Sequence, residues 1–236
     1  MAALTDRDQH ESEVARRISK LMTRHRHEIE KIAGSPPDFS KVPTEYWGKI
    51  GREMESEIIL ILILIFDRAS LQHSPPDGLS EFQQSRVDEI RDRWAAEKSA
   101  EFGRGYSENT RKKLDHLQQR QNESFGQLTD EHDAQKKERK FSDGLVKIFG
   151  PERAAGIAVS EITDATSMGS ETVKHETGEA SNDDLWRTSE KDNVCPICAP
   201  LNRQPRSVWS LKFPKGPKAH YECNCWIEYS KTADKE

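Results

Sequence analysis

Apolar positions in the N-terminal part of the chain recur at the spacing of amphipathic helices. Over residues 1–33 they form a thin stripe: Val14, Ile18, Leu21, Met22, Ile29 and Ile32. This pattern predicts a helix that ends at the breaker Gly-Ser-Pro-Pro of residues 34–37. A second helix is predicted over residues 44–69. Its stretch 58–66 is apolar on every face, so we expect neighbouring helices to enclose it as the core of the N-terminal half.

The alternating Ile and Leu residues of stretch 58–66 also fit a buried strand, but the Glu-rich lead-in favours a helix. Further along, Ser80 and Gln83 form a capping box that begins a helix, and Gly103 and Gly105 are expected to interrupt it after Phe102. Two more helices are predicted over residues 107–121 and 129–140. Residues 142 and 143, Ser-Asp, are then expected to cap a short turn that ends at residue 149.

Gly150 and Pro151 mark the clearest boundary, because proline suits the first position of a new helix. We therefore predict a helical region over residues 1–150 and a C-terminal domain over residues 151–236. The new helix carries a narrow stripe of small and apolar residues suited to close packing: Ala154, Ile157, Ala158, Ile162 and Ala165. A loop is expected over residues 178–184. Short strands are expected at residues 186–188, 208–209 and 226–229.

The composition indicates a chain with much wetted surface. Hydrophobic and charged residues each make up 33% of the 236 residues, and the mean hydropathy is −0.88. Such a chain cannot fill one spherical core, so we expect a mainly α fold: an elongated helical N-terminal body and a small α+β C-terminal unit. The longest apolar run would make a helix of about 13 Å, too short for a membrane span. No signal peptide is visible, and we expect folding in a reducing cytoplasm.

All four cysteines lie close to the C-terminus in two clusters. Cys195 and Cys198 form a CxxC pair, and His220, Cys223 and Cys225 follow it. Two chelating turns joined by a loop are the arrangement that a tetrahedral Zn²⁺ site needs, and clustered cysteines in a reducing compartment favour a metal over disulfides or free thiols. Cys195, Cys198 and Cys225 are expected ligands, and either His220 or Cys223 is expected to complete the shell. The metal would replace a core that so small a unit cannot build.

The charge is unevenly distributed. The net charge is −5, with a formal +3 from Leu185 onward and −8 before it, so neither half is basic enough to predict nucleic-acid binding from charge alone. Residues 193–221 contain no acidic residue, and Trp209 and Phe213 are interleaved with five cations that are candidate DNA contacts: Arg203, Arg206, Lys212, Lys215 and Lys218. The alternative is a solvated basic loop between the two ligand pairs. The acidic helical half is the expected protein-binding side.

The ordered motifs over residues 139–229 resemble the C-terminal domain of tailed-phage minor head (head morphogenesis) proteins, the Mu F-like family. The resemblance rests on a helix with Arg and Ala residues and a Ser-Glu pair, then a Gly, a Trp-x-Thr strand, a CxxC turn and a His/Cys close. These are Arg153, Ala154, Ile157, Ala158, Ser160, Glu161, Ala165, Gly169, Trp186, Thr188, Asp192, Val194, Cys195, Cys198, Leu201, His220, Cys223 and Cys225. The chain departs from the family at Tyr221, where Pro is usual, at Asn224, where Arg is usual, and at Arg203, where Gly is common.

The resemblance implies a low-copy structural protein of the virion. Members of that family lie inside the capsid near the portal vertex, enter during procapsid assembly in the host cytoplasm, and influence genome packaging or ejection. The implied partners are the portal protein and the major capsid or scaffold protein, with packaged DNA as a further candidate and no membrane. The alternative functions are a zinc-dependent nucleic-acid-binding protein and a metal-dependent nuclease or toxin-like enzyme. We expect no enzyme, because five donors for four metal positions favour a closed site and no catalytic motif is evident.

Overall fold

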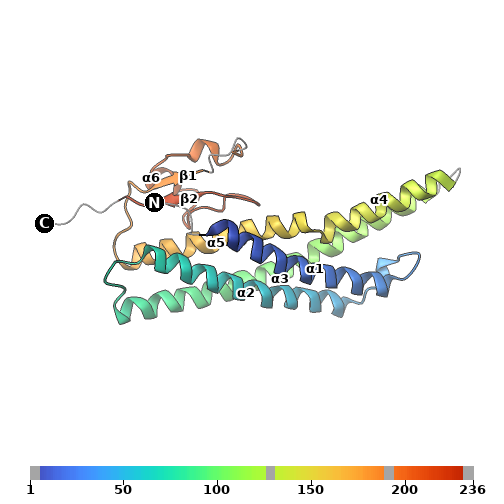
Figure 1. Ribbon diagram of the computed structural model, residues 1–236, viewed down its shortest axis with the longest axis horizontal. Coiled ribbons are helices and arrows are strands. Elements are labelled where there is room, and N and C mark those ends of the chain that lie inside the picture. Colours follow the sequence, from blue (N-terminus) through green and yellow to red (C-terminus); the bar gives the residue numbers. More distant parts are fainter. Residues whose placement is uncertain (1–5, 126–130, 189–193, 231–236) are drawn as a thin grey trace. The chain divides into compact units, whose positions relative to one another are not determined.

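The computed structural model describes residues 6–125, 131–188 and 194–230 of the chain. Within them the chain is mostly helical, with one small sheet of two strands, so the predicted mainly α class is confirmed. Figure 1 shows the long helices and a C-terminal region of short elements. The predicted start of a helix at Thr129, and Asp192 of the motif before the CxxC turn, lie outside the described residues.

Five long helices are followed by short elements in chain order. The helices are α1 (Arg7–Ala33), α2 (Thr44–His73), α3 (Glu81–Phe125), α4 (Glu131–Phe149) and α5 (Pro151–Glu176), with the 3₁₀ turn η1 (Phe39–Lys41) between α1 and α2. After them come β1 (Leu185–Arg187), the 3₁₀ turn η2 (Ala199–Leu201), the single turn α6 (Arg206–Trp209) and β2 (Trp226–Glu228). The capping box is confirmed: the Ser80 amide donates to Gln83 Oε1 at 3.0 Å, and the Gln83 amide donates to Ser80 Oγ at 3.3 Å.

Two predicted helix breaks and one predicted strand were wrong. The helix α3 continues through Gly103 and Gly105, and α4 continues through residues 142 and 143 to Phe149. Gly103 is needed for close packing: a Cβ atom there would lie 2.5 Å from the Gly51 carbonyl oxygen of α2. Residues 208–209, predicted as a strand, lie in α6, where Pro205 precedes the turn as its N-cap residue.

The apolar stretch 58–66 is helical as predicted, but it is not enclosed on every face. Ile58, Leu62 and Ile65 are fully buried, whereas Leu60 is 58% exposed and Leu64 is 44% exposed. One side of α2 therefore packs into the core, and the opposite side presents leucines to solvent. A sequence that is apolar all round gives no hint of which side is buried.

The described chain forms two compact units, and α1, α2, α3 and α5 each contribute to both. The first unit comprises residues 1–13, 59–97 and 156–236, and the second comprises residues 14–58 and 98–155. The helix α5 begins at Pro151 as predicted. However, the C-terminal residues are grouped with parts of α1, α2 and α3, so a domain boundary at residue 150 stays a prediction. In the described ranges no helix is long and apolar enough to cross a membrane.

Candidate metal centre

A small hydrophobic cluster surrounds the cysteines in the first unit. The strands β1 and β2 pair antiparallel, with Trp186 opposite Ile227, and Trp186 packs at 6.0 Å, centroid to centroid, against Trp209 of α6. Both tryptophans are fully buried. Cys198, Cys223 and Cys225 belong to the same buried cluster. The strand pair and the α6 turn therefore fix the segments that carry the donors.

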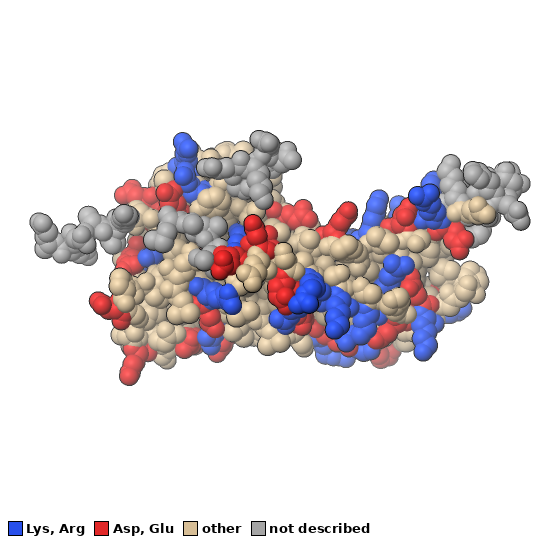
Figure 2. Space-filling view, in the orientation of Figure 1, with Lys and Arg blue, Asp and Glu red and all other residues tan. Residues whose placement is uncertain are grey.

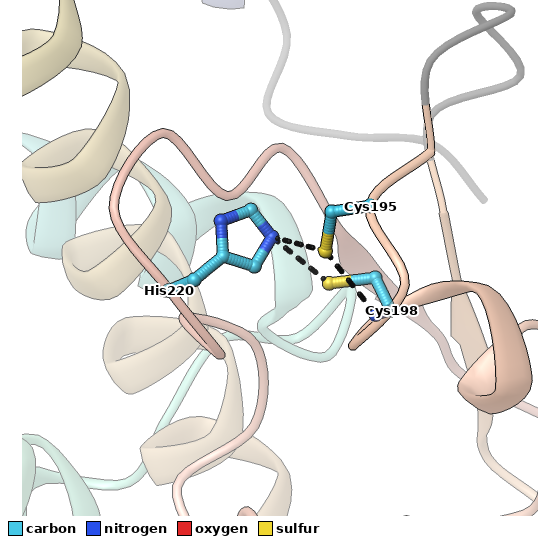
Figure 3. Close-up of side chains that lie close together, drawn as sticks. All are labelled: Cys195, Cys198 and His220. Carbon is cyan, nitrogen blue, oxygen red and sulfur yellow. Dashed lines mark hydrogen bonds between the residues drawn. The ribbon is translucent and has the colours of Figure 1, made fainter.

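The five predicted donors lie together in two overlapping groups. One group contains Cys195, Cys198 and His220, and the other contains Cys198, Cys223 and Cys225; within each group the ligand atoms lie within 4.8 Å of one another. The Nε2 atom of His220 is 2.9 Å from the Cys195 sulfur and 3.1 Å from the Cys198 sulfur (Figure 3). The sulfurs of Cys198 and Cys223 are 3.9 Å apart. Cys198 is thus common to both groups.

Hydrogen bonds around the cluster prepare these atoms to act as ligands. The Nδ1 atom of His220 lies 2.6 Å from the Tyr221 carbonyl oxygen; a proton held there leaves the Nε2 lone pair facing the sulfurs. The Cys198 amide donates to the Cys195 sulfur at 3.3 Å. The buried indole N–H of Trp186 has no hydrogen-bond acceptor among the described residues.

One thiol of this group is poised to lose its proton, and its two neighbours hold theirs. The hydrogen bond from Cys198, together with one from Cys225, lowers the pKa of the Cys223 thiol well below its usual value. The same contact with Cys223 raises the pKa of Cys198, so the group favours one thiolate even with no cation present. Thiolate is the form that binds metal ions. The donor set therefore can hold a metal ion, and both candidates for the fourth ligand, His220 and Cys223, lie within it.

Polar contacts fix this segment against α5. The Lys218 ammonium pairs with Glu161 at 2.9 Å and with Asp164 at 3.0 Å. The Glu222 amide donates to Ser160 Oγ at 2.8 Å, and the Thr163 hydroxyl donates to the Cys223 carbonyl oxygen. The small and polar side of α5 thus contacts the turn that carries His220 and Cys223.

A second anchor was missed by the sequence analysis. The Arg206 guanidinium of α6 forms two hydrogen bonds to Glu171, of 2.5 and 2.9 Å, and another of 2.9 Å to Asp184. Asp184 is fully buried and Glu171 is only 4% exposed. The Tyr229 hydroxyl also donates to Glu171 at 2.8 Å. A pattern search finds no signal for this network, because its members come from α5, a loop, α6 and the residue after β2.

These anchors correct the predicted set of DNA contacts. Arg206 is buried in ion pairs, and the ammonium group of Lys218 is held by two carboxylates, so both side chains hold the fold together instead of facing a ligand. Arg203, Lys212 and Lys215 are exposed. Arg203 has a φ of 62°, in the left-handed region that favours glycine.

Comparisons with known proteins add no relative: no family model, no curated protein and no solved structure matches this chain.

Proposed function

We propose that this protein is a structural minor head protein of the tailed-phage type, in which a Zn²⁺-bound C-terminal segment is a rigid assembly element. The proposal assigns it no catalytic role. Its partners would be the portal protein and the major capsid or scaffold protein, and it would lie inside the capsid near the portal vertex. Packaging and delivery of the genome are the processes it would assist.

One observation carries the proposal: the motifs that resemble the minor head family come together in space as one anchored unit. The donors from the CxxC turn and from the His/Cys close meet at Cys198. The α5 helix that bears the Ser160-Glu161 pair contacts the same segment through Ser160 and Glu161. The left-handed conformation of Arg203, at a position where that family commonly has Gly, agrees with the resemblance.

Zinc is the proposed ion because the donors are thiolates and an imidazole. Sulfur and imidazole ligands in a tetrahedral set suit Zn²⁺, and carboxylate or carbonyl sets suit Mg²⁺ and Ca²⁺. The residues that would hold it are Cys195 and Cys198 with two of His220, Cys223 and Cys225. The ion would supply stability, because the cluster around Trp186 and Trp209 is too small to hold its loops without a further link.

An enzyme is the weaker alternative. A catalytic zinc ion keeps a position open for water or substrate, but here five donors compete for four positions. Cys198, Cys223 and Cys225 are all at most 5% exposed, which leaves little access for a substrate. The alternative function of DNA binding through the C-terminal loop has less support from the structure than from the sequence. Of the five cations in the loop, only Arg203, Lys212 and Lys215 are exposed.

The test is the composition of particles. Mass spectrometry of purified virions and procapsids from the phage that carries this gene should detect the protein in low copy. A variant lacking residues 1–150 should be absent from particles. A gene position directly after the portal and terminase genes would agree with the role. Absence of the full-length protein from both kinds of particle would contradict the proposal.

A further inference from the structure

The two units differ in the sign of their charge. The second unit, residues 14–58 and 98–155, contains 21 Lys and Arg against 17 Asp and Glu, a formal +4. The first unit contains 15 against 24, a formal −9. Residues 1–184 are acidic in total, with a formal charge of −8, but the second unit lies within them and is basic. On the face in Figure 2, Lys and Arg side chains gather over the region where α1 and α4 lie in Figure 1.

A groove runs between α3 and α4 in this basic unit. The helices meet closely at Gly144, where a Cβ atom would lie 2.5 Å from a methyl group of Leu117. Beside that contact two adjoining cavities of about 480 and 510 Å³ share Arg120 and Lys147 in their walls. Lys140 and Phe141 line one cavity, and Lys113 lines the other. The groove thus combines four cations with the rings of Phe141 and His116.

These cations are arranged in two pairs. Lys113 and Arg120 are seven residues apart on α3, and Lys140 and Lys147 are seven residues apart on α4, so each pair spans about 10.5 Å along its helix. All four side chains are exposed. No carboxylate in the described part of the chain pairs with any of them. The two acidic residues of the walls are Glu123, which accepts a hydrogen bond from Gln119, and Asp143.

The charges in the groove favour binding of an anion, because four cations and two acidic residues line it. Partial loss of hydration beside α4, and then the positive charge of Arg153, lower the pKa of the mostly exposed Lys113. A bound anion would relieve this repulsion and stabilise the charged ammonium group. Regularly spaced cations suit a ligand whose negative charges repeat along a chain.

We propose that the α3–α4 groove binds single-stranded nucleic acid, with its phosphates against Lys113, Arg120, Lys140 and Lys147 and a base against Phe141. A basic groove that follows the backbone, together with an aromatic ring on which a base stacks, is the usual means of binding single strands. The cations lie on both sides of the groove, Lys113 and Arg120 on α3 and Lys140 and Lys147 on α4, so a single strand can follow it. The Phe141 ring is half-buried and stacks against Phe39, with the ring centroids 6.0 Å apart, so a base would contact only the part of the ring that stays exposed.

This inference is independent of the minor head role. Its test measures oligonucleotide binding by the purified full-length protein and involves no phage particle. The probe is a fluorescein-labelled oligo-dT of about 15 nucleotides, and its anisotropy reports binding at several salt concentrations. The groove variant combines Lys113→Gln, Arg120→Gln and Lys147→Gln. The matched control combines Arg203→Gln, Lys212→Gln and Lys215→Gln in the C-terminal loop. Circular dichroism of both variants checks that they fold.

We expect the groove variant to bind on the order of tenfold or more weakly, and its plot of log K against log salt to be less steep by about 2 units, as loss of three phosphate contacts requires. The loop variant should bind within about twofold of the wild type, because its cations lie elsewhere. Phe141→Leu should weaken binding with no change in the salt slope. Equal binding by the groove variant and the wild type, equal affinity for a duplex of the same length, or equally effective competition by polyglutamate would each overturn the proposal.

Discussion

The guanidinium group of Arg206 forms a bidentate ion pair with the Glu171 carboxylate, with nitrogen–oxygen distances of 2.5 and 2.9 Å. Arg206 is 8% exposed and Glu171 is 4% exposed. Two planar groups joined by parallel hydrogen bonds fix both distance and angle. The pair therefore holds α6, and with it the segment between the two ligand pairs, against α5.

Arg206→Gln should destabilise the protein more than any other exchange of a cation in the C-terminal loop. The exchange leaves Glu171 and Asp184 as buried carboxylates without their cation, which costs about 3–5 kcal/mol. Arg203→Gln is the matched control, because Arg203 is exposed; its cost should be within about 0.5 kcal/mol. Urea unfolding measures both. Equal stability of the two variants would show that the buried pair does not hold the loop.

The helix α2 offers a test of the exposed side of its apolar stretch. Ile61→Asp and Leu62→Asp place a charge where the side chain is at most 1% exposed, so each should cost several kcal/mol, about 3 or more. Leu60→Asp is the control, because Leu60 is 58% exposed, and it should be nearly neutral. Thermal unfolding followed by circular dichroism distinguishes them. A tolerated aspartate at position 61 or 62 would contradict the packing described here.

The same helix shows what the sequence could and could not predict. Apolar periodicity, capping residues and proline predicted α1, α2 and the start of α5. The spacing of the cysteines predicted that the five donors lie together. Periodicity fails where every face is apolar, as at Leu60 and Leu64. It also fails where a glycine serves tertiary contact: Gly103 meets the Gly51 carbonyl of another helix, which no local pattern encodes.

Long-range ion pairs were the other omission. Arg206 and Lys218 were predicted as free cations because the loop around them has no acidic residue, yet their partners lie 22 to 57 residues away in the chain. A count of charges along a stretch of sequence includes only neighbouring residues and leaves out partners that the fold brings close. The same limitation hid the basic unit, because residues 1–184 average a basic unit with parts of an acidic one.

His73 gives the stability a dependence on pH. Burial, and then the nearby charge of Lys174, lower the pKa of His73 to about 4, and its ring packs edge-on at 4.9 Å against Tyr229. The folded state thus favours the neutral ring, whereas the unfolded chain binds a proton below pH ~6.5. This contribution is complete above pH ~6.5 and is lost as the pH falls toward 4, by at most about 3 kcal/mol.

The variant His73→Phe keeps a ring against Tyr229 and removes the titration. Free energies of urea unfolding, measured from pH 7 to pH 4, should fall less steeply for His73→Phe than for the wild type. Thiol protonation affects both proteins alike, so the difference between the two curves isolates the histidine. Parallel curves would mean that His73 titrates in the folded protein as it does in the unfolded chain.

The metal centre yields the most direct prediction. Purified protein should contain one zinc ion per chain by elemental analysis, and the affinity should fall in acid as the thiols take up protons. Cys198 belongs to both groups of donors, so Cys198→Ser should lose the metal whichever residue is the fourth ligand. The helices before residue 150 should keep most of their circular dichroism, because none of the five donors lies on them. The matched control for His220→Ala is His175→Ala, whose ring is 61% exposed and outside the cluster.

His220→Ala and Cys223→Ser identify the fourth ligand. In cobalt-substituted protein the intensity of the sulfur-to-metal charge-transfer band follows the number of bound thiolates. If Cys223 is a ligand, Cys223→Ser lowers this band and His220→Ala leaves it unchanged; if His220 is the ligand, Cys223→Ser leaves the band unchanged and His220→Ala weakens metal affinity. Either result fits a closed site of four protein ligands. Protein without stoichiometric zinc, or a Cys198→Ser variant that still binds the ion at full affinity, would contradict the site.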